Sequence, residues 1–525
     1  MLLPANVEIG AYFDHFSFAL ILTIIALIIL AIYSAKSNVP TIAHLKQVPG
    51  QLPFLGNLYS LGGRLQENDA TIYSQWAANL GADVFQMRLG DQRTVVANTF
   101  ASIRDLFVGQ ANALIDRPYQ PGFVDKLGLD ISGSPMTESI RRCRMAAMRA
   151  LGKPQWPGYF HLLEPSSISL VNSLVHKGEN GAVPMNIFPY LRQVVFDLTL
   201  SLTYGARQVD VEDTFTLSLV TAIREISKVR SSTVRFRDFV PLARIIPEPQ
   251  SKVIAAEKVR QAHLDVLYSA LLKRVAGGEN VDCIATSLGA DHLTEDEIHG
   301  TCKSLLQAAP GTIASAVYQC VAWLCSPEGQ RFQPELYQAI LDAYDGEKDR
   351  AWKMAFREEE VPLVTSLYKE TLRFYTVTPF GTPRSTTRDV TYGKAVIPKG
   401  TTVIMNAQAG NHDPARYGED ACTFNPRRFL KDHSSLPHLT YGAGSRICPA
   451  VAISNRIMSA LLIRLILAFK MTETQISTRK PSVDILRFSD VHSSLLCVPK
   501  EYDCHFVARD QNWLLRKLDE EHVGL

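Results

Sequence analysis

A single cysteine, Cys448, stands at the end of a loop of small residues, YGAGSRICPA at positions 441–450. A cysteine thiolate can ligate a metal ion, and Gly442 and Gly444 let the backbone pass close to a flat cofactor. An apolar segment that is predicted to be helical follows the cysteine. Amide groups at the start of such a helix favour the thiolate. The alternative is a buried structural cysteine, which is the commoner role of a lone cysteine.

Two charged motifs precede this loop. Glu370 and Arg373 are three residues apart in a segment predicted to be helical, so both side chains lie on one helix face. The later sequence FNPRRF, at positions 424–429, contributes Arg428. A Glu–Arg pair on a protein surface stabilises a fold by only about 0.5 kcal/mol. The order and spacing of the three motifs are therefore more informative than any one of them.

The cysteine loop resembles the haem-binding signature F-x-x-G-x-R-x-C-x-G of the cytochrome P450 family. Tyr441 replaces the Phe of that signature, and Ala450 replaces its last Gly. The family also has E-x-x-R and then P-x-R-F, in this order and at similar spacings. The resemblance covers nearly the whole chain after its N-terminal apolar run. It implies haem b as the cofactor, with Cys448 as the axial ligand of the iron.

The resemblance also assigns roles to charged residues. Glu370, Arg373 and Arg428 would form a buried triad that holds the cysteine loop. Such a triad is favourable only if every donor is met, and loss of one partner is then severe. The haem propionates would be bound by three arginines, namely Arg446, Arg384 and Arg144.

The motif that assigns Arg144 to a propionate matches the family pattern less well than those of the other two arginines. It ends a W-x-x-x-R motif in which Ile140 replaces the Trp. The alternative is a solvated helix arginine, which is common. A basic face that suits an acidic electron donor is predicted from its neighbours Arg141, Arg142 and Arg149.

The sequence QAAPGTI, at positions 307–313, resembles the central helix of the family, whose pattern is [A/G]-G-x-[D/E]-T. There the acid and the Thr relay protons during oxygen activation. Thr312 matches the Thr, whereas Gly311 occupies the acid position and Ala309 the glycine position. Pro310 is expected to break or kink the helix, because it removes a hydrogen bond and clashes with the preceding turn. Either Thr312 merely fills this helix, or water or a substrate hydroxyl replaces the acid.

The composition excludes several classes of protein. The chain has 525 residues, of which 46% are hydrophobic and 20% charged, and its net charge is +2. This balance gives no electrostatic reason to expect nucleic-acid binding. The nine cysteines are odd in number and include no C-x-x-C. They are therefore read as reduced thiols of a protein that faces the cytosol rather than as a disulfide framework.

Residues 16–33 form an uncharged apolar run of 18 residues. As a helix it would be about 27 Å long, enough to cross an endoplasmic reticulum bilayer. A cleaved signal peptide is the alternative, but no basic region precedes the run and no clear cleavage site follows it. Lys36 and Lys46 follow the run, which favours a cytosolic catalytic domain.

The predicted fold is mainly α with a minor β-sheet region, preceded by one transmembrane helix. The predicted division is a short lumenal N-terminus (1–15), a signal-anchor (16–33), a hinge with a proline-rich segment (34–57) and a haem-thiolate domain (58–525). Helices dominate the sequence from about 137 to 375, and a last helix is predicted at about 450–469. Strands are predicted at 84–89, 93–97, 390–396 and 401–405, the first two joined at Gly90-Asp91.

Several segments look similar to fungal phenylacetate-type aromatic hydroxylases of the family. They are NALIDRP at 112–118, SP at 134–135 and SPEGQ at 326–330. The implied function is a membrane-anchored monooxygenase that inserts one oxygen atom from O2 into a small aromatic substrate, in fungal secondary metabolism. By analogy, Phe123, Val377 and Phe380 could contact the substrate, although plain core is the commoner role of such residues.

The chain carries no dinucleotide-binding fingerprint after a strand. NADPH, FAD and FMN would therefore act through a separate NADPH–cytochrome P450 reductase at the endoplasmic reticulum membrane. Two alternatives remain. One is an isomerase, dehydratase or peroxygenase of the same fold, which Gly311 favours. The other is a degenerate membrane-bound scaffold protein, which would not need Cys448.

Overall fold

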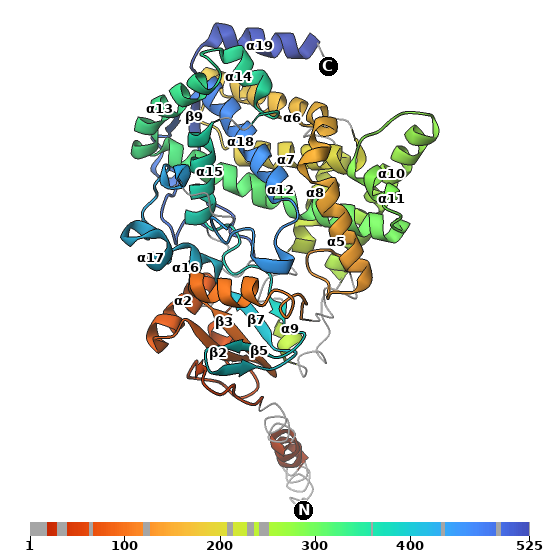
Figure 1. Cartoon of the computed structure of the whole chain (residues 1–525), viewed down its shortest axis with the longest axis vertical. Helices are drawn as coiled ribbons and strands as arrows, with labels where there is room; N and C mark the ends of the chain where they lie inside the picture. The colour runs from red at the N-terminus through yellow and green to blue at the C-terminus, as the bar shows by residue number, and fades with distance from the viewer. Residues whose placement is uncertain are drawn as a thin grey trace, which may run out of the picture.

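The structure is a computed structural model that describes residues 18–28, 39–61, 67–118, 127–206, 214–227, 236–240, 251–358, 361–431, 436–489 and 495–523. A large helical part occupies the upper two thirds of the view in Figure 1, and a smaller part built on a β-sheet lies beneath it. The prediction of a mainly α fold with a minor β region is confirmed.

The largest sheet has five strands in the order β1-β2-β3-β7-β4. Their bounds are Lys46–Gln47, Val84–Leu89, Gln92–Ala97, Thr402–Met405 and Arg384–Ser385. Strands β2 and β3 form the predicted antiparallel hairpin. Gly90 in its turn has φ 59°, and a Cβ there would lie 1.8 Å from the carbonyl oxygen of Phe239. Strand β7 pairs in parallel with β3, which joins the C-terminal half of the chain to the N-terminal hairpin.

Two predictions of secondary structure are wrong. The strand predicted at 390–396 is an antiparallel pair, β5 (Val390–Tyr392) and β6 (Ala395–Ile397), because Gly393 reverses the chain with φ 57°. The helix predicted at 450–469, α18 (Val451–Ala468), is not the last one. Strands β8 (Phe469–Glu473) and β9 (Cys504–Ala508) follow it, and then helix α19 (Gln511–Val523).

The helical part contains most of the remaining elements. In chain order they are α5 (Glu138–Ala150), α6 (Trp156–Lys177), α7 (Phe188–Tyr204), α8 (Thr214–Ser227), α10 (Ser251–Ala276), α11 (Ile284–Ala290), α12 (Glu295–Cys325), α13 (Pro327–Ala343), α14 (Lys348–Met354) and α15 (Pro362–Phe374). Further α-helices are α2 (Asp69–Leu80), α3 (Phe100–Ile103), α9 (Phe236–Phe239), α16 (Ala407–Asn411) and α17 (Pro414–Tyr417).

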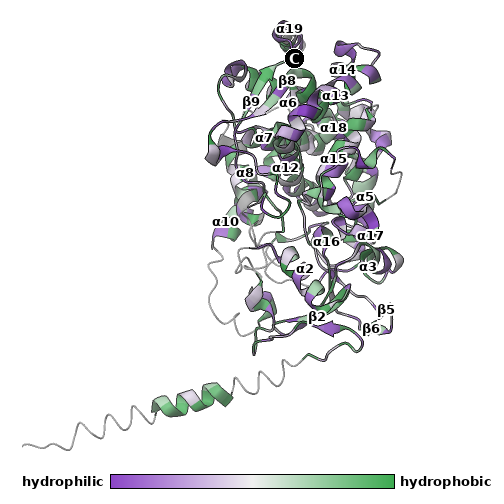
Figure 2. Cartoon of the chain, turned by 90° about the vertical axis from the view of Figure 1, so that its left-hand side faces the viewer, coloured by the Kyte–Doolittle hydropathy of each residue, from purple (hydrophilic) through white to green (hydrophobic). Residues whose placement is uncertain are grey.

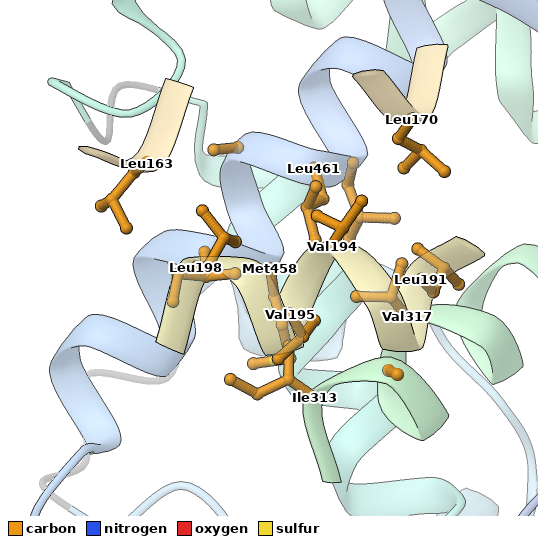
Figure 3. Close-up of a cluster of buried hydrophobic side chains, with 14 of the residues drawn as sticks. Leu163, Leu170, Leu191, Val194, Val195, Leu198, Ile313, Val317, Met458 and Leu461 are labelled. Atoms are coloured by element: carbon orange, nitrogen blue, oxygen red, sulfur yellow. The ribbon is translucent and has the colours of Figure 1, made fainter. Parts of the chain in front are cut away.

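Helix α12 runs through the middle of the helical part. Its N-terminus is a capping box, in which Thr294 and Glu297 each bond the backbone N–H of the other. Figure 3 shows Val317 of α12 among leucine and valine side chains of α6 and α7 and beside Met458 of α18. This core fixes α12 against the helix that follows the cysteine loop.

Pro310 does not interrupt α12, which is helical from Glu295 to Cys325. Of the expected break or kink, the break does not occur. The turns on either side, residues 301–306 and 313–325, are buried. Tertiary packing of these turns outweighs the low helix propensity of one proline.

The N-terminal apolar run includes a helix, Phe18–Ile28, most of which Figure 2 colours as hydrophobic. Its side chains are exposed. The rest of the predicted span 16–33 lies outside the described residues. Within those residues, only Val451–Ala468 is long and apolar enough to cross a membrane. Because 83% of that helix is buried, it is a core helix of the catalytic part.

Candidate active site

The loop around Cys448 is closed by its own backbone. The N–H of Cys448 donates a hydrogen bond of 3.0 Å to the carbonyl of Tyr441, and α18 begins three residues after the cysteine. The Tyr441 hydroxyl donates to Oδ1 of Asn455 on α18 at 2.7 Å. The replacement of Phe by Tyr in the motif therefore adds a bond between the loop and the next helix.

The two glycines of the loop serve different purposes. Gly444 has φ 65°, and a Cβ there would lie 1.7 Å from the carbonyl oxygen of Phe107. This glycine is thus required for packing on the helical turn Arg104–Gly109 rather than for approach of a cofactor. Gly442 has φ 80°, and a Cβ there would meet no heavy atom within 4 Å. The backbone at Gly442 is therefore open.

The Cys448 thiol is half-buried and experiences opposing influences. Burial raises its pKa, because the thiolate loses hydration, whereas the N–H of Ala450 and the guanidinium of Arg144 act to lower it. The predicted amide stabilisation is present, but burial outweighs it in the protein alone. A metal ion at the sulfur would add the positive charge that the thiolate needs.

Arg144, Arg384 and Arg446 lie close together and are each at most 6% exposed. Burial, followed by repulsion from the neighbouring arginines, lowers the pKa of Arg384 to about 9 and that of Arg446 to about 10. Arg144 donates to the carbonyl of Ile447, next to the cysteine, at 2.9 Å. Arg384 donates to the carbonyl of Ala443 at 2.8 Å. The structure therefore brings the three predicted arginines to the cysteine loop.

These arginines donate to backbone carbonyls, while the carboxylate of Asp130 acts through space on Arg144 and Arg446, and that of Asp116 acts on Arg446. Among the residues that the structure describes, none of the three forms an ion pair, and Nε of Arg446 has no hydrogen-bond partner. Buried charges are costly unless they are paired. The donor set therefore fits a ligand that brings two anionic groups, such as the propionates of haem.

Glu370, Arg373 and Arg428 form a connected ion-pair network. Arg373 contacts Glu370 through Nε at 2.7 Å and Nη2 at 2.8 Å, and both side chains are fully buried. Nε of Arg428 lies 3.2 Å from the same carboxylate. Arg428 also pairs with Asp420 at 2.9 Å. The N–H of Asn425 donates to Glu370 as well, so the buried carboxylate has donors on both oxygens.

Asn411 connects this network to the cysteine loop, and no sequence motif pointed to it. Its carbonyl accepts from Nη1 of Arg373 at 2.7 Å. Its side chain accepts from the N–H of Leu439 at 2.7 Å and donates to the hydroxyl of Thr440 at 3.2 Å. These two residues directly precede Tyr441. Because the contacts span 28 and 38 residues, no local pattern could have indicated them.

Thr312 and Gly311 lie in an accessible stretch of α12. Residues 307–312 are half-buried or exposed, although the turns on both sides are buried. The Thr312 hydroxyl donates to the carbonyl of Ala308 at 2.8 Å, so its lone pairs remain free to accept. A Cβ at Gly311 would lie 2.9 Å from a methyl carbon of Leu496. The acid position is therefore occupied in part by an apolar side chain.

Two further predictions gain no support as functional sites. Phe380 is buried in the same hydrophobic cluster as Tyr73 of α2, and the two rings pack edge-on with their centroids 6.5 Å apart. Val377 is also buried. Phe123 lies outside the described residues. The basic face predicted on α5 is neutralised, because each arginine has an acidic partner. The pairs are Arg141–Glu138, Arg142–Glu297 and Arg149–Asp291.

Comparison with known proteins places the chain in a family. The cytochrome P450 family model matches residues 47–502. Phenylacetate 2-hydroxylase from Emericella nidulans is 34% identical over 91% of this chain and 93% of its own length. A 3-hydroxyphenylacetate 6-hydroxylase from the same organism is 29% identical over 90% of each chain. A cytochrome P450 monooxygenase of Mycosarcoma maydis is 28% identical over 86% of this chain and 87% of its own. Together with the cysteine loop and its buried arginines, these matches show that the chain belongs to the cytochrome P450 family.

Proposed function

We propose that this protein is a membrane-anchored haem-thiolate monooxygenase that inserts one oxygen atom from O2 into a small aromatic substrate. The observation that carries the proposal is the group of three buried arginines beside Cys448. Among the described residues, none of them forms an ion pair with a carboxylate, and each is at most 6% exposed. A catalytic haem explains both the cations and the cysteine, whereas a scaffold protein requires neither.

In this proposal Cys448 ligates the haem iron, and Arg144, Arg384 and Arg446 bind its propionates. When bound, haem supplies an electron-rich iron–thiolate centre that activates dioxygen. The triad of Glu370, Arg373 and Arg428, through Asn411, keeps the cysteine loop in position.

Thr312 is the residue proposed to hold a proton donor near the reacting oxygen. Its own proton is engaged by the carbonyl of Ala308, so the hydroxyl oxygen accepts from a water molecule or a substrate hydroxyl. Gly311 contributes no acid, and Leu496 restricts the space beside it. Proton delivery at this position therefore depends on groups other than the usual carboxylate.

The proposal of an aromatic substrate is supported by two relatives, which are named as hydroxylases of phenylacetate and of 3-hydroxyphenylacetate. We place the reaction in fungal secondary metabolism, with electrons delivered from NADPH through the FAD and FMN of a separate reductase. The exposed apolar helix Phe18–Ile28 supports a signal-anchor at residues 16–33. Residues 34–57 would then be the hinge, and residues 58–525 would face the cytosol at the endoplasmic reticulum membrane.

The decisive experiment is the carbon monoxide difference spectrum of the dithionite-reduced protein. We expect a strongly red-shifted Soret band in the wild type and its loss in Cys448→Ser. Cys422→Ser is the matched control, because Cys422 is also a free cysteine and is exposed. A thiolate band that persists in Cys448→Ser would contradict the assignment of the ligand.

An isomerase, dehydratase or peroxygenase of the same fold is the second candidate, and Gly311 is the observation that favours it. The two candidates differ in what they consume. A monooxygenase uses NADPH and dioxygen when the reductase is present, whereas the second candidate turns over without them. Product formation in the absence of NADPH would therefore decide for the second candidate.

A further inference from the structure

A cavity of about 520 Å³ lies where the N-terminal segment meets the largest sheet, and the function proposed above does not use it. Val39 and Pro40 line it together with residues 398–402. Its lining is exposed at Pro40 and Lys399, whereas Arg93 of the same lining is only 8% exposed. The cavity therefore has an exposed cation at its rim and a buried cation at its floor.

Arg93 has no carboxylate partner among the described residues. Its Nε donates to the carbonyl of Pro40 at 3.2 Å, and its Nη2 donates to the carbonyl of Val39. Its Nη1 is buried and has no hydrogen-bond partner in the described part of the chain. Burial lowers the pKa of Arg93, and repulsion from Arg88 lowers it further. A buried cation of this kind is stabilised by a nearby anion.

The strand register places a second cation next to Arg93. Arg88 of β2 lies directly opposite Arg93 of β3, so the two side chains are on one face of the hairpin. Arg88 is also 8% exposed, and it donates to the carbonyl of Leu52 at 3.4 Å. Like charges that lie opposite each other destabilise a pair of strands. An anion in the cavity relieves this repulsion.

The carboxylates near the cavity do not balance its cations. Asp91 is also among the lining residues, but it is not among the groups that shift the pKa of Arg93. At the rim, the backbone N–H of Lys399 donates to Asp389 at 2.9 Å. The ammonium group of Lys399 forms no ion pair with any residue that the structure describes. Three cations therefore face two carboxylates, and a positive charge remains for a ligand.

The cavity is held close to the proposed membrane span. Val39 comes six residues after the end of the signal-anchor proposed at 16–33, and six residues extend over at most about 22 Å. The segment that follows is fixed to the hairpin, because Nε2 of Gln86 donates to the carbonyl of Ile42 at 2.8 Å. In Figures 1 and 2 the sheet lies between the helical part and the apolar helix Phe18–Ile28. Lipid headgroups at the bilayer surface are therefore within reach of the cavity.

We propose that this cavity binds the phosphate headgroup of an anionic phospholipid of the membrane. Lys399 binds the phosphate at the rim, and the positive charge of Arg93 stabilises it from the floor. This inference rests on the membrane anchor of the proposed function and goes beyond it. A lipid bound here is a second attachment besides residues 16–33, so it fixes the orientation of the sheet towards the bilayer.

The test uses the haem-loaded, full-length protein in a neutral detergent. Dihexanoyl phosphatidylserine, dihexanoyl phosphatidylcholine and inorganic phosphate are titrated separately, and isothermal titration calorimetry measures each affinity. We expect phosphatidylserine to bind at least about tenfold more tightly than phosphatidylcholine, whose headgroup has no net charge. We also expect it to bind at least about tenfold more tightly than inorganic phosphate, because the micelle around the anchor concentrates lipid near the cavity.

Two variants assign the binding to the cavity. Arg93→Gln removes the buried cation, and Lys399→Gln removes the exposed cation without touching the contacts of Val39 and Pro40. Each is expected to weaken phosphatidylserine binding by about fivefold, which is the contribution of one Lys or Arg near a membrane surface. Lys394→Gln is the matched control, because Lys394 is an exposed lysine between β5 and β6 that does not line the cavity.

Equal affinity for the two lipids in the wild type would overturn the inference. Equal losses in Lys399→Gln and Lys394→Gln would also overturn it, because they would show a diffuse attraction to the membrane surface. Binding of inorganic phosphate as tight as that of phosphatidylserine would show a site for free phosphate and overturn the assignment to a lipid.

The carbon monoxide spectrum, recorded on the same samples, separates failure of this inference from failure of the proposed function. A thiolate spectrum without a lipid preference rejects only the inference. A lipid preference without a thiolate spectrum rejects the proposed reaction and leaves the lipid site in place.

Discussion

At the scale of single residues, the site depends on charges that are buried before any ligand arrives. Glu370 satisfies two arginines at once, whereas the arginines beside Cys448 have only carbonyl partners. The first group is paired within the protein, whereas the second forms no ion pair among the described residues and is opposed through space by Asp116 and Asp130. This difference separates residues that hold the loop from residues proposed to hold a cofactor.

Glu370→Gln tests the complete group. The substitution leaves the fully buried Arg373 without its counter-ion, so we expect the free energy of unfolding to fall by about 3–5 kcal/mol. Urea unfolding followed by circular dichroism measures the change. Glu328→Gln is the control, because Glu328 forms an exposed pair with Arg331 at the same i,i+3 spacing and should change stability by less than about 0.5 kcal/mol. Similar effects of the two substitutions would contradict a structural role of the triad.

At the scale of elements, α12 is buried at residues 301–306 and 313–325 but accessible at residues 307–312 between them. Its helical, apolar character was predicted from the sequence, because the spacing of apolar residues is a local pattern. Its continuity through Pro310 was not readable, because packing against α7 and α18 decides it. Other elements also divide into those set by local patterns and those set by distant contacts. The hairpin at Gly90-Asp91 has a local turn signal, whereas α19 was missed because it is secured by distant contacts, such as that of Trp513 with Asp349.

The candidate site shows the same limits. Glu370, Arg373, Arg428 and Cys448 occur in recognisable motifs, and the structure places the first three in one network. Asn411 occurs in no motif, since its contacts with Leu439 and Arg373 span 28 and 38 residues of the chain. Its role arises from the way distant segments pack, which a single sequence does not reveal.

Gly311→Asp tests whether α12 lacks a proton donor. We expect more product per NADPH consumed in this variant than in Gly311→Ala, because only Asp adds an acid beside Thr312. The alanine variant is the control for sterics, since a Cβ at this position meets Leu496 at 2.9 Å in either case. Equal coupling of the two variants would show that another group already delivers the proton.

At the scale of the whole molecule, the apolar helix Phe18–Ile28 differs from the other apolar helix, Val451–Ala468. The first exposes its side chains, whereas the second is mostly buried in the core. Deletion of residues 1–33 is therefore expected to move the protein from the membrane pellet to the supernatant at high salt while keeping the thiolate spectrum. Retention in the pellet with an intact spectrum would indicate a second membrane contact.

The buried arginines also bear on how much of this protein a cell can maintain. Without an anionic partner, Arg144, Arg384 and Arg446 repel one another in a region that excludes water. A partner that binds only the native state raises the population of that state by mass action. Steady-state abundance should therefore follow the cellular supply of porphyrin, and chains made during porphyrin starvation should be degraded sooner.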